Sequence, residues 1–324
     1  MASSETGSPS AGSATGPLPG VGDVLAAAHR IGPYIHRTPV LTSRSIDAMA
    51  GAGVHFKCEN FQRSGSFKLR GALAAVTAAL TAARERGVIT HSSGNHGAAL
   101  ALAGQRLGVD VTVVMPEAAS DFKRRAVLRY GARVVGCGPT LADREAALAE
   151  AQAARGALFV PPYDHPQVIA GQGTAALELL AAVPELTVIY VPVGGGGLAC
   201  GTVLAAAASG VAVRGGEPEL ADDAYRSLAC GVRQPAPEPR TVADGLRTAL
   251  GALNFRLLLD HGLPVIRVSE AAIVEAQRLI WNCLKIVVEP SAAVPLAAVL
   301  AQPAGERERV GVILSGGNVD LPGL

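Results

Sequence analysis

Short apolar runs alternate with longer alanine-rich segments along almost the whole chain. The run VTVVM at 111–115 and the run TVIYVPV at 187–193 are apolar at nearly every position. Such runs are typical of strands in a parallel sheet that is covered on both faces. The alanine-rich segments between them have the length of helices. This alternation predicts an α/β fold with mostly parallel sheets.

The same pattern predicts the individual elements. The expected helices cover 71–86, 97–107, 121–130, 141–154 and 173–182. The expected strands cover 54–57, 88–91, 111–115, 133–136, 157–160, 187–193, 211–214, 264–268 and 310–314. In α/β folds, ligands bind at the carboxyl ends of the strands, so the loops that enter helices are where a site is expected.

The first twenty residues, MASSETGSPSAGSATGPLPG, break this pattern. Their Ser, Gly, Ala and Pro content predicts a disordered tail over 1–20. The segment lacks the basic and apolar regions of a signal peptide, so a cytoplasmic location is expected. Only ten residues follow the last predicted strand, and a C-terminal regulatory domain is therefore not expected.

The composition narrows the class of function. The 324 residues carry 28 Lys and Arg against 27 Asp and Glu, a net charge of +1, so no excess charge favours nucleic acid or an anionic membrane. Aromatic residues make up 4%, which disfavours base-stacking surfaces. No apolar run is long enough to span a bilayer. With nucleic-acid-binding and membrane proteins disfavoured, the expected class is an enzyme that acts on a small molecule.

The five cysteines are widely spaced, and none forms a C-x-x-C pair. A zinc cluster or a disulfide framework would need closer or paired spacing. Isolated thiols buried as small apolar side chains in a reducing compartment are the expected state.

Only four of the basic residues are lysines, and an amine, unlike a guanidinium, can lose its proton and condense with a carbonyl. Lys57, in VHFKCEN, is expected at a solvated strand edge. Lys123 is expected on a basic helix face and Lys285 on an amphipathic run. Lys68 follows the loop SGSF and starts a helix, where the helix dipole disfavours a positive charge. Lys68 is therefore the candidate nucleophile, with a plain surface lysine as the alternative.

Four consecutive glycines, 194–197, follow the predicted strand 187–193 and open an apolar helix. Without Cβ atoms, their N–H groups can converge on an anion such as a phosphate at the helix N-terminus. The run lacks the Gly-Lys-Ser/Thr of nucleotide hydrolases. It fits the degenerate G-x-G-x-x-G/A pattern through Ala199, with Glu217 about twenty residues on, so a dinucleotide site stays open. A simple tight turn also stays open.

Six motifs together resemble the fold-type-II pyridoxal-phosphate enzymes, in the branch of the serine/threonine dehydratases and serine racemases. They are SGSFKLRGA (64–72), SSGNHG (92–97), AGQGTAALE (170–178), VGGGGLACG (193–201), ADG (243–245) and LSGGNVD (314–320). The resemblance covers the chain from about residue 21 onward. It implies a two-domain fold like that of the tryptophan synthase β chain. It also implies a larger cofactor-binding domain over 21–86 and 165–324, a smaller domain over 87–164, and a homodimer.

The resemblance also implies roles in binding the cofactor, pyridoxal 5′-phosphate. Lys68 would join the cofactor's aldehyde and later act as the base, and Phe67 would pack on the ring. Asn95 would hydrogen-bond the phenolic oxygen. Ser315 would hydrogen-bond the pyridine nitrogen, which favours elimination over transamination because a hydroxyl fixes no positive charge there. The phosphate would be held by Gly194, Gly195, Gly196 and Gly197.

For the substrate carboxylate, the resemblance implies binding by Ser92, Ser93, Asn95 and His96 at a helix start, a favourable place for an anion. Ser93 would also be the acid opposite Lys68, since racemases of the family have S-S-G-N-H where many threonine dehydratases have S-A-G-N-H. Simpler interpretations exist: Ser92 as a helix cap, His96 as a core histidine and Ser315 as a turn residue.

The segment GEPELADD (216–223) is similar to a cation-binding segment of the racemase-like members. The matching ligands are the Glu217 and Asp223 carboxylates and the Ala221 carbonyl, a set that suits Mg²⁺, Mn²⁺ or Ca²⁺. A solvated acidic loop is the alternative. Arg144 matches a racemase arginine that approaches the substrate, although a helix-surface arginine would look the same.

The expected activity is that of an ammonia-lyase, or dehydratase. It would convert a β-hydroxy amino acid such as L-serine or L-threonine to a 2-oxo acid and ammonia. The alternatives are a serine racemase with side elimination activity and a threo-3-hydroxyaspartate dehydratase. In each case the partner is a small amino-acid substrate, with no nucleic acid and no membrane.

Overall fold

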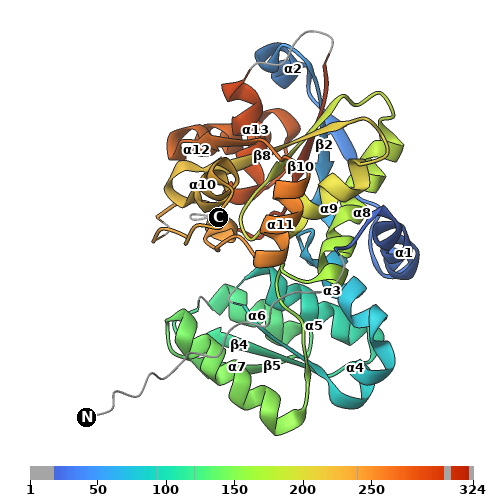
Figure 1. Cartoon of the computed structure of the whole chain (residues 1–324), viewed down its shortest axis with the longest axis vertical. Helices are drawn as coiled ribbons and strands as arrows, with labels where there is room; N and C mark the ends of the chain where they lie inside the picture. The colour runs from blue at the N-terminus through green and yellow to red at the C-terminus, as the bar shows by residue number, and fades with distance from the viewer. Residues whose placement is uncertain (1–17, 93, 120, 239, 303–307, 321–324) are drawn as a thin grey trace.

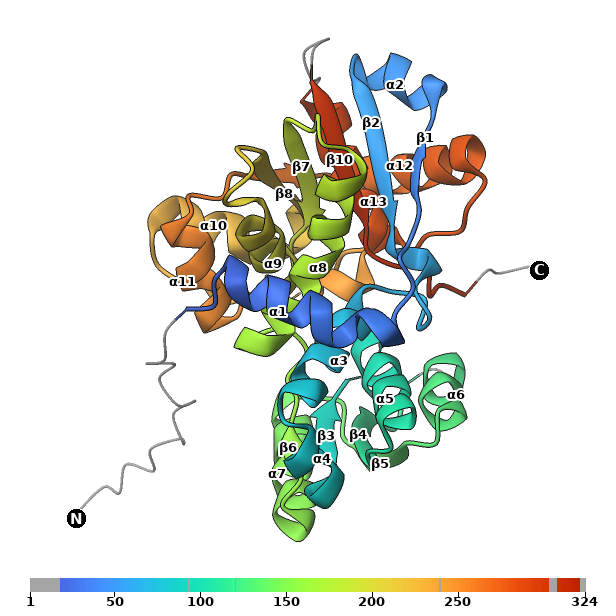
Figure 2. The ribbon, with the colours of Figure 1, turned by 90° about the vertical axis from the view of Figure 1, so that its right-hand side faces the viewer.

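The computed structural model describes residues 18–92, 94–119, 121–238, 240–302 and 308–320. They form an α/β structure with two sheets, one in each of two lobes (Figures 1 and 2). The larger sheet has the order β1-β2-β10-β7-β8-β9 and the smaller sheet the order β5-β4-β3-β6. Strand β1 runs antiparallel to β2, and all the other neighbours are parallel. The predicted fold class, α/β with mostly parallel sheets, is confirmed.

Nine of the strands match the predicted ones, with boundaries shifted by a few residues. Strand β1 was not predicted, because three partly exposed residues, VLT, are too short for a hydrophobic pattern. The strands are β1 (Val40–Thr42), β2 (Gly53–Cys58), β3 (Val88–His91), β4 (Val111–Pro116), β5 (Arg133–Cys137), β6 (Leu158–Phe159), β7 (Val188–Pro192), β8 (Ala212–Pro218), β9 (Val265–Val268) and β10 (Arg309–Leu314).

The prediction of one helix over 71–86 is wrong, because two helices cover it. At their junction Ala79 leaves the helical conformation, with φ −126° and ψ 35°. Just before it, the Thr77 hydroxyl bonds back to the carbonyls of Leu73 and Ala74, a contact that weakens a helix. The α-helices are α1 (Val21–Ile31), α2 (Arg44–Ala50), α3 (Lys68–Ala78), α4 (Leu80–Arg86), α5 (Asn95–Leu107), α6 (Asp121–Arg129), α7 (Leu141–Arg155), α8 (Pro166–Ala182), α9 (Gly197–Ala206), α10 (Asp223–Cys230), α11 (Ala252–Asp260), α12 (Glu270–Leu279) and α13 (Pro290–Ala301).

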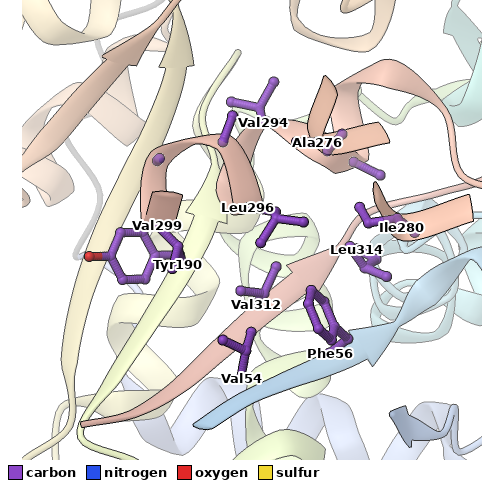
Figure 3. Close-up of a cluster of buried hydrophobic side chains, with 14 of the residues drawn as sticks. Val54, Phe56, Tyr190, Ala276, Ile280, Val294, Leu296, Val299, Val312 and Leu314 are labelled. Atoms are coloured by element: carbon purple, nitrogen blue, oxygen red, sulfur yellow. The ribbon is translucent and has the colours of Figure 1, made fainter. Parts of the chain in front are cut away.

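The larger sheet is covered on both faces, as its apolar strands require. Along β10, Val310, Val312 and Leu314 point to the core that α12 and α13 close, whereas Ile313 points to the core under α8 and α9. Figure 3 shows the first of these cores, with Phe56 and Val312 facing the helices. Burial of both faces explains why the strand carries apolar residues at consecutive positions.

The smaller sheet follows the same rule. In β4, Val113 and Met115 pack with α3 and α5, and Val114 packs with α7 on the opposite face. Helix α3 contacts both α5 of the smaller lobe and α8 of the larger one. The first residues of α3 are therefore fixed by both lobes (Figure 2).

A buried ion network lies under the start of α3. The Arg70 guanidinium is fully buried and pairs with Glu59 at 2.7 Å and with Glu178 at 2.8 Å. Lys57 pairs with Glu178 at 2.6 Å and also donates to the Thr38 carbonyl. The prediction of Lys57 at a solvated edge is wrong, because β2 lies between β1 and β10 and the side chain is only 1% exposed. Burial lowers the pKa of Lys57.

Two further predictions need correction. The predicted tail extends too far: Leu18 packs against the core and Gly20 caps α1, whereas residues 1–17 lie outside the described part. The five cysteines are free, as predicted, and three are buried, but Cys230 is exposed. No helix in the described part of the chain is both long and apolar enough to cross a membrane.

The network predicts a large loss of stability on Arg70→Ala. The substitution leaves the Glu59 and Glu178 carboxylates inside the protein with less compensating charge, which costs about 3–5 kcal/mol of unfolding free energy. Urea unfolding followed by circular dichroism measures this loss. Arg278→Ala, which removes an exposed arginine 3.9 Å from Glu275, is the matched control and is expected to change stability by less than about 0.5 kcal/mol. Equal stability of the two variants would contradict the prediction.

Candidate active site

A cavity of about 1030 Å³ lies between the two lobes, where loops from both sheets meet. Parallel strands bring their carboxyl ends to the same edge, which explains why loops distant in sequence share this cavity. Ser93 lies outside the described residues. Every other predicted cofactor or substrate residue lines the cavity: Phe67, Lys68, Ser92, Asn95, His96, Gly194, Gly195, Gly196, Gly197 and Ser315.

Lys68 is the first residue of α3, and its amine lies among aromatic rings. Its Nζ donates to the Pro162 carbonyl at 2.8 Å and lies 5.1 Å from the ring centre of Phe67 and 5.9 Å from that of Tyr163. Burial lowers the pKa of Lys68 to about 8, although the charge of Glu289 opposes the shift. Burial is thus the main reason why this amine gives up its proton more easily than a free lysine.

The glycine run forms a narrow cradle at the N-terminus of α9. A Cβ on Gly195 would lie 2.4 Å from the Tyr163 ring, and Gly196 has a φ of +93°, which side chains rarely adopt. The Gly195 carbonyl is held by Asn254 Nδ2 at 2.6 Å. Only glycine allows this close approach, and it leaves a helix N-terminus open to an anion. The cradle therefore fits a phosphate group.

A second helix N-terminus, that of α5, faces the same cavity. Asn95 and His96 are the first residues of α5, so their N–H groups have no acceptor within the helix. The Ser92 hydroxyl accepts from the N–H of Gly94 at 3.2 Å. The arrangement suits a carboxylate. The start of α5 belongs to the smaller lobe, whereas the glycine cradle belongs to the larger lobe, and both line the cavity.

The His96 ring fits the simpler interpretation, a buried core histidine. It is 2% exposed, and burial lowers its pKa to about 3, so the ring is neutral. Nε2 lies 3.0 Å from the Val160 carbonyl and must carry the hydrogen. Nδ1 then has no hydrogen to donate, and no described residue bonds to it. His96 therefore offers its backbone N–H, not its ring, to an anion in the cavity.

The loop that carries Lys68 is tied to the end of β10. The Phe67 N–H donates to the Ser315 carbonyl at 3.0 Å, and Ser66 forms an isolated antiparallel bridge with Gly316. Ser315 is 2% exposed and lines the cavity. The segment that begins at Ser315 thus fixes the position of the two residues that precede the lysine.

Three further residues line the cavity and were not singled out from the sequence: Tyr163, Glu289 and Asn318. Tyr163 lies between Lys68 and the glycine cradle, and burial raises its pKa to about 12. Its only sequence signal is its place just after a predicted strand. Glu289 precedes Pro290 at a helix start, where a cap is the ordinary interpretation. Asn318 belongs to the motif SGGN, but its carboxamide is neutral and unreactive, so nothing in the sequence singles it out.

Cationic side chains dominate the cavity wall formed by the smaller lobe. The Arg144 Nη2 donates to the Pro139 carbonyl at 3.2 Å, and its buried Nε has no partner among the described residues. Lys123 on α6 pairs with Asp244 of the larger lobe at 2.7 Å across the rim. The basic lining residues are Arg63, Lys68, His91, His96, Lys123, Arg125, Arg129, Arg144 and Arg247, and the acidic ones are Asp244 and Glu289.

The predicted cation site lies in the larger lobe, next to the cavity-lining residues 246–249. Glu217 is fully buried and accepts from the N–H groups of Ala224 and Tyr225, at 3.0 and 2.7 Å. Asp223 is 1% exposed and accepts from the Leu250 N–H at 2.7 Å. Burial raises the pKa of Glu217 to about 8 and also raises that of Asp223.

Two buried carboxylates that form no ion pair within the described chain fit a divalent cation, with the buried Ala221 as the third predicted contributor. No group of three or more His, Cys, Asp or Glu suited to a metal occurs among the described residues. The dinucleotide alternative is wrong, because it requires Glu217 to reach a ribose and the carboxylate is instead bonded to buried backbone.

Comparisons with known proteins agree with this geometry. The chain is 46% identical over 310 residues to the β-hydroxyaspartate dehydratase of Paracoccus denitrificans, covering 95% of the chain and 98% of that protein. It is 43% identical over 308 residues to the L-threo-3-hydroxyaspartate ammonia-lyase of Saccharomyces cerevisiae, covering 94% of each. The crystal structure of serine racemase from Dictyostelium discoideum superposes with a TM-score of 0.90 at 44% identity, covering 94% of this chain and 99% of that one.

The family model described as "Pyridoxal-phosphate dependent enzyme" matches residues 31–316, a span that contains the lysine loop, both helix N-termini and the glycine cradle. The chain belongs to the family of pyridoxal-phosphate dependent enzymes.

Proposed function

We propose that this enzyme is an ammonia-lyase that converts a β-hydroxy amino acid, such as L-serine or L-threonine, to a 2-oxo acid and ammonia. The observation that carries the proposal is that three features line one cavity: the Lys68 amine with its lowered pKa, the glycine cradle that fits a phosphate, and the N-terminus of α5, which suits a second anion. The substrate loses its β-hydroxyl and its Cα proton as water, and hydrolysis then releases ammonia. The elimination releases one water and the hydrolysis consumes one, so a 2-oxo acid and ammonia are the net products.

When bound, pyridoxal phosphate withdraws electrons from the Cα of the amino acid joined to it, and so acidifies the Cα proton. Lys68 is the base that removes this proton. Its pKa, lowered by burial to about 8, supports the role because a base must be deprotonated, and a much larger fraction of this amine is neutral near physiological pH than of an ordinary lysine. The rings of Phe67 and Tyr163, with centres 5.1 and 5.9 Å from Nζ, give the amine apolar neighbours.

The two helix N-termini orient the reactants. Gly194 to Gly197 bind the phosphate at the start of α9, and the start of α5, with Ser92 and Asn95, binds the substrate carboxylate. Ser315 at the end of β10 binds the pyridine nitrogen. A hydroxyl in that place supports elimination rather than transamination.

A divalent cation, Mg²⁺ or otherwise Mn²⁺ or Ca²⁺, binds at Glu217, the Ala221 carbonyl and Asp223. Its role is structural: Asp223 also holds the Leu250 N–H, and the neighbouring segment 246–249 forms part of the cavity wall. A cation there neutralises two buried carboxylates and so stabilises that wall.

A second candidate substrate is 3-hydroxyaspartate, whose side chain adds a carboxylate. The observation that favours it is the cationic wall, above all the buried Nε of Arg144, which has no partner among the described residues. Two relatives that are named for this substrate support it. Serine racemase activity is the third candidate, since the resemblance implies that the Ser93 hydroxyl is the acid opposite Lys68 and several relatives are named serine racemases.

We expect Lys68→Ala to lose both the visible absorbance of the bound cofactor and the release of 2-oxo acid. Among the described residues, the other lysine that lines the cavity is Lys123, which lies at the rim. Lys285→Ala, which changes an exposed lysine, is the control and keeps both properties. Borohydride reduction followed by peptide mass mapping identifies the modified lysine. A label on Lys57, Lys123 or Lys285 would rule out the assignment.

Arg144→Ala is expected to lower kcat/KM for 3-hydroxyaspartate roughly 10- to 100-fold, since a hydrogen bond to a charged group contributes about 1.5–3 kcal/mol. The value for L-serine should change by less than about threefold, because serine has no second carboxylate. Arg106→Ala, an exposed arginine on α5, is the control. Equal losses on both substrates would contradict a role for Arg144 in binding the side chain.

Chiral chromatography of the same reactions detects racemisation, which Ser93→Ala should abolish while leaving 2-oxo acid release.

Removing the cation with EDTA should lower the thermal midpoint of the enzyme, and added Mg²⁺ should restore it, because a ligand that binds only the folded state stabilises it. Glu217→Gln is expected to abolish this sensitivity. Glu219→Gln, two residues away and exposed, should leave it intact. A midpoint that does not respond to EDTA in the unmodified enzyme would contradict the cation site.

A further inference from the structure

Glu289 is a buried carboxylate in the cavity wall that the reaction outlined above leaves without a role. It is 3% exposed, and its backbone N–H donates to the Gly316 carbonyl at 3.0 Å, which places it at the start of α13. Both of its carboxylate oxygens accept from Asn95 Nδ2, each at 3.0 Å. A buried acid that faces a cofactor-site amide this closely affects how that amide is oriented.

The contact begins a chain of hydrogen bonds with a defined direction. Asn95 Oδ1 accepts from Asn318 Nδ2 at 2.8 Å, and the same Nδ2 donates to the Ser64 carbonyl at 2.8 Å. A carboxylate and a carbonyl are acceptors only. The chain therefore ends in an acceptor on each side, at Glu289 and at Ser64, and both carboxamides can satisfy it in only one orientation.

In this orientation one N–H of the Asn95 carboxamide is not used by the chain of hydrogen bonds. Asn95 Nδ2 carries two hydrogens, and the pair of equal distances to Glu289 places one of them between the two carboxylate oxygens. The second hydrogen has no acceptor among the described residues, and Asn95 lines the cavity. Asn318 has no such freedom, because its two Nδ2 hydrogens are both used.

The chain also reaches the loop that precedes Lys68. Gly65 has a φ of +74°, and a Cβ there would lie 2.2 Å from Asn318 Oδ1, so the loop can approach Asn318 only with glycine in this place. Ser64 and Gly65 thus connect the amide chain to the segment that carries the lysine.

We propose that Glu289 is a positioning residue: as a carboxylate it turns the Asn95 carboxamide so that its remaining N–H points to the phenolic oxygen of the bound cofactor, and protonation of Glu289 releases that orientation. This inference rests on the proposed function, because the contact of Asn95 with the cofactor is part of it. A protonated carboxyl can donate as well as accept, so it no longer requires the N–H of Asn95, and only the bond from Asn318 then holds the amide in the donor orientation.

The protonation state of Glu289 changes in the physiological range. Burial raises the pKa of Glu289 to about 7, Asp244 adds to the increase, and the hydrogen bond from Asn95 and the charges of Lys123 and Lys68 oppose it. These groups face Glu289 from η4 (Asp244–Leu246), α5, α6 and α3. The carboxylate form, and with it the oriented amide, gains population as the pH rises through about 7.

The test is the pH dependence of the visible absorbance of the holoenzyme, measured without substrate from pH 5.5 to 8.5. In the unmodified enzyme the band should titrate with an apparent pKa near 7. Glu289→Gln keeps the shape of the side chain but lacks the charge, so its spectrum at pH 8.5 should resemble that of the unmodified enzyme at pH 5.5. Glu275→Gln, an exposed acid on α12, is the control and should titrate like the unmodified enzyme.

Asn318→Asp provides a second, independent variant, because an aspartate in place of Asn318 cannot donate to Asn95 Oδ1. Its spectrum at pH 8.5 should shift in the same direction as that of Glu289→Gln. The proposal is overturned if the band of the unmodified enzyme does not change over this pH range. It is also overturned if Glu289→Gln folds and binds the cofactor but its band titrates like that of the unmodified enzyme. Absence of any cofactor band in the unmodified enzyme would instead contradict the proposed function.

Discussion

The buried charge of Arg70 is the constraint on which the placement of Lys68 depends. Arg70 lies two residues after Lys68 on α3 and pairs with Glu59, which follows β2, and with Glu178 on α8. Charges removed from water are tolerated only when their partners are in place, so this set of ion pairs has one acceptable arrangement. The first turn of α3 is thereby fixed against both a strand and a helix of the larger lobe.

From that fixed point the parallel topology supplies the remaining site. The larger lobe contributes the N-terminus of α9 with its glycines, and the smaller lobe contributes the N-terminus of α5. Two positive helix ends that face one cavity suit a bound pair of anions, which we propose are the cofactor phosphate and the substrate carboxylate. Tyr163 fills the space between the lysine and the glycines, so only a residue without a Cβ fits at position 195.

The sequence predicted the α/β class and nine strands because burial on both faces of a parallel sheet leaves continuous apolar runs. It missed β1, whose antiparallel pairing converts Lys57 from an expected edge residue into a buried ion-pair partner. Motifs of the chain predicted the candidate cofactor- and substrate-binding residues that line the cavity, but did not single out Tyr163, Glu289 or Asn318. Their importance comes from neighbours far away in the sequence: Asn95 and Glu289 are 194 residues apart. The cause of the low pKa of Lys68 was likewise invisible, because burial is a property of the folded cavity.

The ion pair between Lys123 and Asp244 joins the two lobes at the rim of the cavity, and its partners are 34% and 40% exposed. A pair this accessible to water and salt contributes about 0–1 kcal/mol, so thermal motion breaks it readily. This pair therefore ties the two lobes only weakly at the cavity rim, and separating them there costs little of the molecule's stability.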